Sequence, residues 1–188
     1  MLELNSLSQL LARVIANPFD VVLIALLVAA AVIDWRTYRI PNWLTYGGMT
    51  FGLLYNAAAH GFMAGMLPAM SGLGLGLVLL LPLYALRVMG AGDVKLMAMV
   101  GAFLGSPEIL YAVLFTFVAA GIAALAFALW LRSFTRVVRN VGGLMQSVAF
   151  AAMAGHRPER GMASIGKMPY GISICVGTVA WLAVTRLG

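Results

Sequence analysis

Long apolar runs separated by short polar connections dominate this sequence. A helix that crosses the hydrocarbon core of a bilayer needs ~20 mostly apolar residues. Only 10% of the 188 residues are charged, compared with about 25% in soluble domains. The pattern therefore predicts an all-α polytopic membrane protein with about six transmembrane helices, over residues 19–35, 42–59, 66–89, 93–105, 108–131 and 169–187.

Prolines and glycines indicate where these helices begin and how they pack. Asn17-Pro18 is a cap residue followed by proline, which favours a helix start there. Pro68 and Pro82 are expected to interrupt the third span. Small residues spaced by four allow helices to approach closely, and this spacing occurs at Gly48/Gly52 and Gly72/Gly76.

The remaining polar segments suggest one membrane domain with a surface segment before it. Residues 1–17 carry Glu3 near their start and lack the basic start of a secretory signal, so 2–16 are expected to lie on the membrane surface. Residues 18–188 form the predicted membrane domain, which includes a basic loop over 132–168. Within that loop, 142–155 could pack on the membrane or join a substrate groove. The single Cys175 excludes an internal disulfide.

The distribution of basic residues predicts the orientation of the chain. With the N-terminus outside, the turns at 36–41 and 87–95 and the loop at 132–168 face the cytoplasm. These three segments hold ten of the twelve Lys and Arg residues, as the positive-inside rule requires. The net charge of +6 is then best explained by contact with anionic lipids of the cytoplasmic leaflet, and nucleic acid is not an expected partner.

Two of the six acidic residues lie where the predicted topology places them at the same membrane edge. Glu3 and Glu159 are in polar segments, and Asp20 and Glu108 are at the outer ends of spans. Asp34 ends the first span and Asp93 begins the fourth, both at the cytoplasmic edge. Ionisable groups near hydrocarbon are costly and are usually functional.

Each aspartate also has a purely structural interpretation. Asp93 could be the N-cap of its helix, and Asp34 could pair with Arg36 or Arg39. If the two approach each other, however, like charges cannot both ionise and the pair shares a proton. One carboxylate then activates water and the other donates a hydrogen bond to the scissile carbonyl. The helix dipoles favour Asp93, at a helix start, as the more ionised member.

The residues around the two acids suggest how a site could be shaped. Gly90 and Gly92 would let the backbone turn tightly into the fourth span and admit a substrate chain. Lys95 lies two residues after Asp93 and points away from it on a helix; it is interpreted either as a cytoplasmic anchor or as a contact for substrate or for the acids. Asn42 is interpreted as a cap or as a substrate contact. His60 and His156 have no metal-ligand neighbours, so no metal or cofactor is expected.

Three motifs together carry a family resemblance. "GAGDVKL" at 90–96 matches the GxGD signature of intramembrane aspartyl proteases. "DWRTYRIPNWLT" at 34–45 is similar to the first-aspartate motif of the type IV prepilin peptidases, which continues into Ile-Pro-Asn. "KMPYG" at 167–171 resembles the Pro-(Phe/Tyr)-Gly element that opens the last span of that family.

The resemblance implies a fold, an activity and a site. It implies an inner-membrane endopeptidase of six to eight spans that removes a short basic leader from prepilin or pseudopilin precursors at the cytoplasmic face. Asp34 and Asp93 would be the catalytic pair, and no cofactor is implied. The residues implied to bind substrate or shape the site are Gly90, Gly92, Lys95, Pro41, Asn42, Pro169, Tyr170 and Gly171.

Other readings remain open at this stage. The segment between the first two spans has no CxxC motifs, unlike the larger bacterial members, so the chain resembles the small peptidases of Tad/Flp pili; archaeal preflagellin peptidases are also similar. A signal-peptide-peptidase-like enzyme would have Tyr-Asp and Pro-Ala-Leu motifs, which differ from Ile33-Asp34 and Pro169-Tyr170-Gly171. A small proton- or cation-coupled transporter or channel using both aspartates is the non-enzymatic alternative. The sequence specifies neither a particular prepilin nor an oligomeric state.

Overall fold

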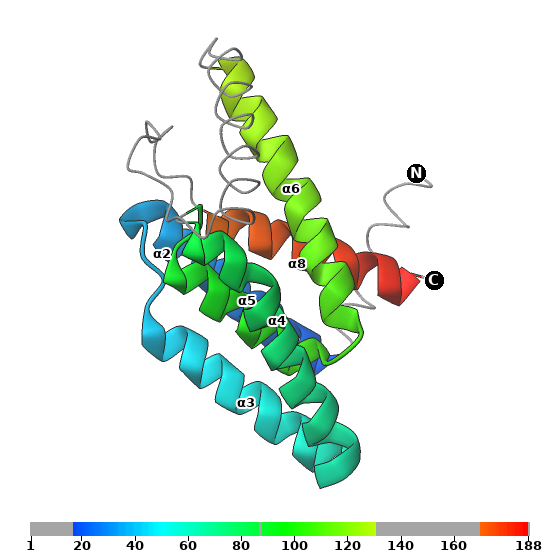
Figure 1. The fold of residues 1–188 in the computed structure, drawn as a ribbon. Coiled ribbons are helices and arrows are strands. Elements are labelled where there is room, and N and C mark those ends of the chain that lie inside the picture. Colours follow the sequence, from blue (N-terminus) through cyan, green and yellow to red (C-terminus); the bar gives the residue numbers. More distant parts are fainter. Residues whose placement is uncertain (1–16, 87, 131–169, 188) are drawn as a thin grey trace, which may run out of the picture. The chain divides into compact units, whose positions relative to one another are not determined.

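The computed structural model describes residues 17–86, 88–130 and 170–187, and these residues are helical with no strand among them. The prediction of an all-α fold is confirmed (Figure 1). The expected surface helix at 2–16, the basic loop at 132–168 and its segment 142–155 lie outside the described residues. The elements are α2 (Pro18–Thr37), α3 (Asn42–His60), the π-helical η1 (Phe62–Met66), α4 (Leu67–Ala85), α5 (Ala91–Leu104), α6 (Glu108–Trp130) and α8 (Tyr170–Leu187).

The chain forms two compact units. The first comprises Met1–Ala120 and Pro169–Gly188, and the second comprises Gly121–Met168. Of the second unit, the described part is the C-terminal portion of α6. All contacts discussed below lie within the first unit.

Local chemistry explains where the first helix begins and ends. The Asn17 side chain accepts a hydrogen bond from the Phe19 N–H at 3.1 Å, and Pro18 occupies the first turn. This is the predicted start, because a proline there removes an N–H that has no helical partner. The helix stops at Thr37, where Tyr38 adopts the left-handed conformation with φ of 51°.

The third predicted span differs from its expected form. The π-helical η1 leads directly into α4, which ends at Ala85 instead of continuing to residue 89. Pro68 lies in the first turn of α4, where a proline costs little. Pro82 lies inside α4 but does not end it, since the helix continues for three more residues. Neither proline therefore divides the span.

Helix α5 is the centre of the first unit. Its residues from Leu96 to Phe103 are all buried, including Met97 and Met99. Helices α3 and α4 pack against it through the predicted glycine pairs. A Cβ added to Gly76 would lie 2.6 Å from the Met97 carbonyl oxygen, and one added to Gly52 would lie 3.1 Å from the Ala102 backbone. The small residues allow the backbones to approach closely.

Helix α2 packs along α8 with a single buried face. Residues spaced by three and four lie on one face of a helix, and the buried residues of α2 have this spacing. Two aspartates belong to the face, one near each end of the helix, separated by roughly 21 Å at 1.5 Å per residue. The buried residues are Asp20, Leu23, Leu27, Ala30 and Asp34.

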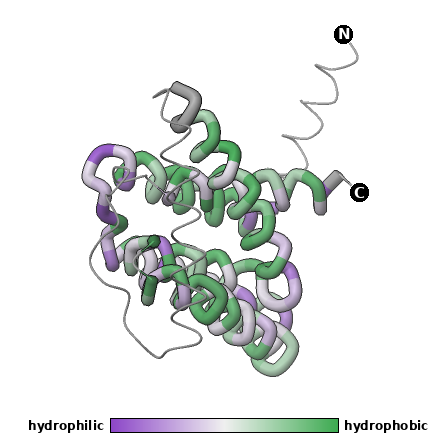
Figure 2. Tube along the Cα trace, turned by 45° about the horizontal axis from the view of Figure 1, so that its top comes forward, coloured by the Kyte–Doolittle hydropathy of each residue, from purple (hydrophilic) through white to green (hydrophobic). Residues whose placement is uncertain are grey.

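Several helices are long and apolar enough to cross a membrane. Pro18–Thr37, Phe62–Ala85 and Glu108–Ala126 meet both conditions, and Tyr170–Arg186 is a shorter apolar helix. Apolar residues run along most of the helices (Figure 2), and many large apolar side chains are exposed. The protein is therefore a multi-pass membrane protein, while the count of six crossings remains a prediction.

Candidate active site

Asp34 lies in the last turn of α2, and its side chain is only 6% exposed. Its Oδ2 atom accepts a hydrogen bond of 2.9 Å from the backbone N–H of Gly171 at the start of α8. The structural alternative, pairing of Asp34 with Arg36 or Arg39, is not observed among the described residues. The carboxylate therefore faces inward, toward α8.

Asp93 lies in the first turn of α5 and is 7% exposed. Its Oδ2 accepts a hydrogen bond of 3.0 Å from the N–H of Gly90, the residue that caps the helix. Helix α5 begins at Ala91 and its N-cap is Gly90. Asp93 is therefore the third residue of the helix and not its N-cap. An acidic group in the first turn interacts favourably with the helix dipole.

The two aspartates, 59 positions apart in the chain, lie near each other in space. The carboxylate of Asp34 acts electrostatically on that of Asp93. The first turn of α8 contacts Asp34 directly through the Gly171 N–H, and its Tyr170 lies within electrostatic range of Asp93. Each carboxylate bonds to backbone through Oδ2, and no hydrogen bond to either Oδ1 is formed within the described part of the chain.

The glycines at the site are required by close approach and not by unusual backbone angles. Gly90 has φ of −79° and ψ of 156°, an extended conformation open to any residue, so the expected tight glycine turn is not observed there. A Cβ on Gly92 would lie 3.1 Å from the Ile40 Cβ, and a Cβ on Gly171 would lie 2.9 Å from Asp34 Oδ2. Side chains at these positions would crowd the acids or the turn beside them.

Lys95 and Asn42 form a contact that the sequence did not predict. The Lys95 ammonium donates a hydrogen bond of 2.9 Å to Asn42 Oδ1, and it lies 5.1 Å from the centre of the Tyr46 ring. Asn42 is not the cap of α3, because Pro41 occupies that position and makes no side-chain cap bond. The Asn42 amide is thereby left to bind a residue of α5. Tyr46 and Ile40 were not recognised in the sequence, since only the fold brings them beside Lys95 and Gly92.

Other polar features lie away from this site. Pro169 lies outside the described residues. Asp20 pairs with Arg186 at 2.8 Å, and both line a pocket of about 400 Å³ at the end of the first unit opposite Asp34. The described residues contain no group of three or more His, Cys, Asp or Glu side chains that could hold a metal ion.

Buried acids at helix ends in a multi-pass helical protein define a class, the membrane-embedded hydrolases or ion carriers. Residues 21–125, more than half of the chain, match the type IV leader peptidase family, and the chain belongs to that family. The matched range includes both Asp34 and Asp93. The protein is thus a protease that acts on leader peptides of prepilin-like substrates, and the transporter alternative is not supported. No curated protein and no solved structure shows a significant match.

Proposed function

We propose that this chain is an aspartic endopeptidase that removes the short basic leader from Flp/Tad-type prepilins at the cytoplasmic face of the bacterial inner membrane. Asp34 and Asp93 are its catalytic pair. The observation that carries the proposal is that these two buried carboxylates lie within electrostatic range of each other, with Asp34 bonded to the first turn of α8. The other acids of the described residues that share a location, the buried Asp20 and the partly buried Glu108, lie beside Arg186, with which Asp20 forms an ion pair.

The proposed reaction is the direct attack of water on the scissile amide. The ionised carboxylate takes a proton from water while the water oxygen bonds to the carbonyl carbon, and the protonated carboxylate donates to the carbonyl oxygen. Collapse of the tetrahedral intermediate breaks the C–N bond, and the amine nitrogen leaves with a proton. The two Oδ1 atoms, which accept no backbone hydrogen bond from the described residues, are the oxygens proposed for these steps.

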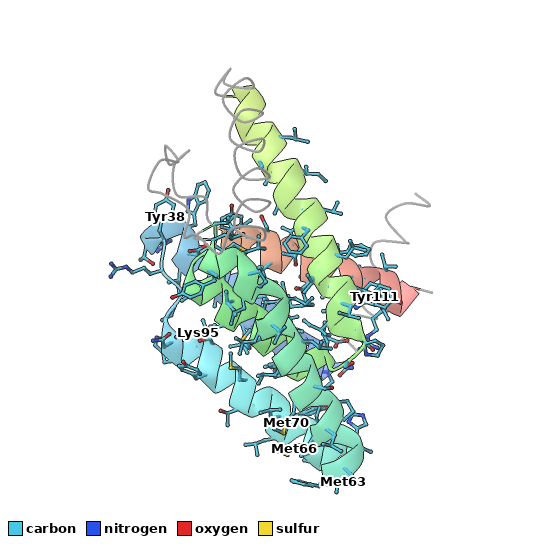
Figure 3. All side chains as sticks on the ribbon, in the orientation of Figure 1. Tyr38, Met63, Met66, Met70, Lys95 and Tyr111 are labelled. Atoms are coloured by element: carbon cyan, nitrogen blue, oxygen red, sulfur yellow. The ribbon has the colours of Figure 1, made fainter. Side chains whose placement is uncertain are left out.

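Exposed aromatic side chains support a position of the site at the membrane–water interface. Trp35 is 65% exposed and Trp43 is 72% exposed, and each lies one or two residues from an element of the site. Tyr38 and Tyr46 are also exposed, and Tyr38 is labelled beyond the end of α2 (Figure 3). Trp and Tyr are enriched at both interfaces of a bilayer. These four exposed aromatic side chains therefore support a site at the membrane edge.

The decisive experiment is co-expression with an Flp-type prepilin, followed by measurement of leader removal from the size of the pilin. We expect the wild type to process the precursor and Asp34→Asn and Asp93→Asn to lose activity by roughly 10²–10⁴-fold or more, because general acid–base catalysis supplies about that factor. Glu108→Gln is the matched control. Glu108 is a partly buried acid at the opposite end of the unit.

The outcomes separate the parts of the proposal. Processing by both Asp variants at the wild-type rate would disprove the catalytic assignment. Equal loss in Glu108→Gln would show that removal of any partly buried acid is damaging. Processing of type IV prepilins of another class, with the Flp-type precursor left intact, would disprove the proposed substrate but leave the aspartic mechanism in place.

A further inference from the structure

The connection that follows Asp34 contacts the first turn of α5, which carries Asp93. This connection joins α2 to α3. Its Ile40 packs on Gly92 at the start of α5, where an added Cβ would lie 3.1 Å from the Ile40 Cβ. Ile40 is buried. This apolar contact therefore joins the α2–α3 connection to the start of α5.

A polar contact also joins the start of α3 to α5. Lys95 and Asn42 are 53 residues apart in the sequence, and their side chains form a hydrogen bond of 2.9 Å. The ammonium also lies over the Tyr46 ring, one helical turn after Asn42 on α3. Figure 3 shows Lys95 beside the first turn of α3. We call this contact the Asn42–Lys95 bridge.

The choice of partner for Lys95 is informative. Lys95 is the fifth residue of α5, just beyond the first turn, so the helix dipole does little to determine which partner its ammonium takes. Among the described residues, Lys95 forms no ion pair with Asp34 or Asp93. A neutral amide holds the ammonium instead. Lys95 is therefore not a counter-ion of either carboxylate, a role that would stabilise the charge of both and prevent them from sharing a proton.

The bridge also lies where the spacing of the acids is determined. Helix α3 packs extensively on α5, and α8 packs extensively on α2, whereas α2 and α5 contact each other at few positions. The separation of Asp34 and Asp93 therefore depends on elements other than their own two helices. We propose that Asn42 and Lys95 are positioning residues whose bridge holds the Asp34 turn and the Asp93 turn at the separation that hydrolysis requires. This inference rests on the proposed aspartic mechanism.

Kinetics of prepilin cleavage test the proposal. We expect Lys95→Met and Asn42→Leu each to lower kcat by about 10- to 100-fold with little change in KM, because a misplacement near 1 Å can cost about 100-fold. The double variant Asn42→Lys with Lys95→Asn exchanges donor and acceptor and should recover most of the lost kcat. Ser71→Ala is the control, since it removes an exposed hydrogen bond of α4 away from the site.

A second readout requires no peptidase activity. In a Cys175→Ser background, Asp34→Cys and Asp93→Cys provide two thiols for a short bifunctional thiol reagent. We expect efficient cross-linking, a several-fold lower yield when Lys95→Met is added, and recovery when the exchanged pair is introduced. Circular dichroism and elution volume check that each variant is folded.

The two readouts distinguish failure of this inference from failure of the proposed function. Unchanged kcat in Lys95→Met, or unchanged cross-linking yield, would overturn the positioning role. A rise in KM alone, with kcat retained, would overturn it in favour of a direct substrate contact. If the wild type cleaves no prepilin, the proposed function fails, and the cross-linking result still decides whether the bridge sets the separation of the two acids.

Discussion

At the scale of single residues, the site is formed by backbone donors and by positions that lack a side chain. Asp34 and Asp93 each accept a hydrogen bond from a glycine N–H, at 2.9 and 3.0 Å. A glycine donor leaves space beside the carboxylate, which any larger residue would fill. The glycines of this site are therefore best understood as space for the acids and for whatever binds between them.

Gly171→Ala tests whether the space beside the Asp34 carboxylate is needed, because it adds a single methyl group there. The new methyl group would lie 2.9 Å from Asp34 Oδ2 and 3.1 Å from its Cβ, so the carboxylate must shift by several tenths of an ångström. We expect prepilin cleavage to fall by about 100-fold while the protein remains folded, because alanine is favoured over glycine in helices. The measurement is the initial rate of leader removal by purified protein in detergent or nanodiscs.

Gly74→Ala is the matched control for that prediction. Gly74 is also helical, and an added Cβ there would meet no atom within 4 Å. We expect its cleavage rate to equal that of the wild type. Equal rates in Gly171→Ala and the wild type would show that Asp34 tolerates displacement, and would argue against a demanding geometry at the site.

At the scale of elements, the position of Asp93 depends on how tightly α5 is surrounded. Helix α5 has 14 residues and is buried by α3 and α4, whose glycines lie against its backbone. Because lipid is as apolar as the side chains, association of such helices depends on close packing and not on the hydrophobic effect. Loss of that packing should therefore reduce stability before it alters chemistry.

Gly76→Val should destabilise the fold. Its Cβ would lie 2.6 Å from the Met97 carbonyl oxygen of α5, and backbone atoms cannot move aside as a flexible side chain can. We expect the free energy of unfolding to fall by at least about 1–3 kcal/mol, the usual cost of overpacking. Unfolding monitored by circular dichroism during titration with a denaturing detergent measures the change.

Gly74→Val separates packing from helix propensity. The substitution introduces the same β-branched residue into the same helix, but at a position with open space around it. Its stability should remain close to that of the wild type. A similar loss in both variants would attribute the effect to helix propensity and would contradict the close contact between α4 and α5.

At the scale of the whole molecule, the first unit is polarised between its two ends. One end contains Asp34, Asp93 and the exposed Trp35 and Trp43, and the opposite end of α2 contains the buried Asp20. At that opposite end, Asp20 forms an ion pair with Arg186 near the end of α8. Helices α2 and α8 are thus joined by a polar contact at each end, since Gly171 of α8 donates to Asp34. The polarity and the distribution of basic residues predict that the Asp34 end faces the cytoplasm.

Cysteine accessibility in intact cells tests this orientation. In a Cys175→Ser background, Trp43→Cys should react only after the membrane is permeabilised, whereas Met63→Cys should react with an impermeant thiol reagent in intact cells. Both positions are highly exposed, at 72% and 70%, so differences in burial do not complicate the comparison. Labelling in the reverse order would place the aspartates outside and would contradict cleavage at the cytoplasmic face.

The sequence by itself determined the helical class and most helix boundaries, and it predicted the two aspartates as candidate site residues. These properties are local, because an apolar run, a cap or a motif can be recognised without knowledge of the rest of the chain. The boundaries at the third span were predicted less well, since Pro68 and Pro82 are tolerated by the positions they occupy within α4. Asn42 was interpreted as a cap for a similar reason, as caps are local signals and its partner is not.

Only the tertiary structure decided which distant residues meet. The donor to Asp34 is a backbone N–H 137 residues away, and the partner of Lys95 is an amide 53 residues away. No local pattern encodes such a pairing, because it follows from the way α3 and α8 pack beside α5 and α2. Packing fixes the separation of the carboxylates, and their separation determines whether two ordinary aspartates can share a proton and activate water.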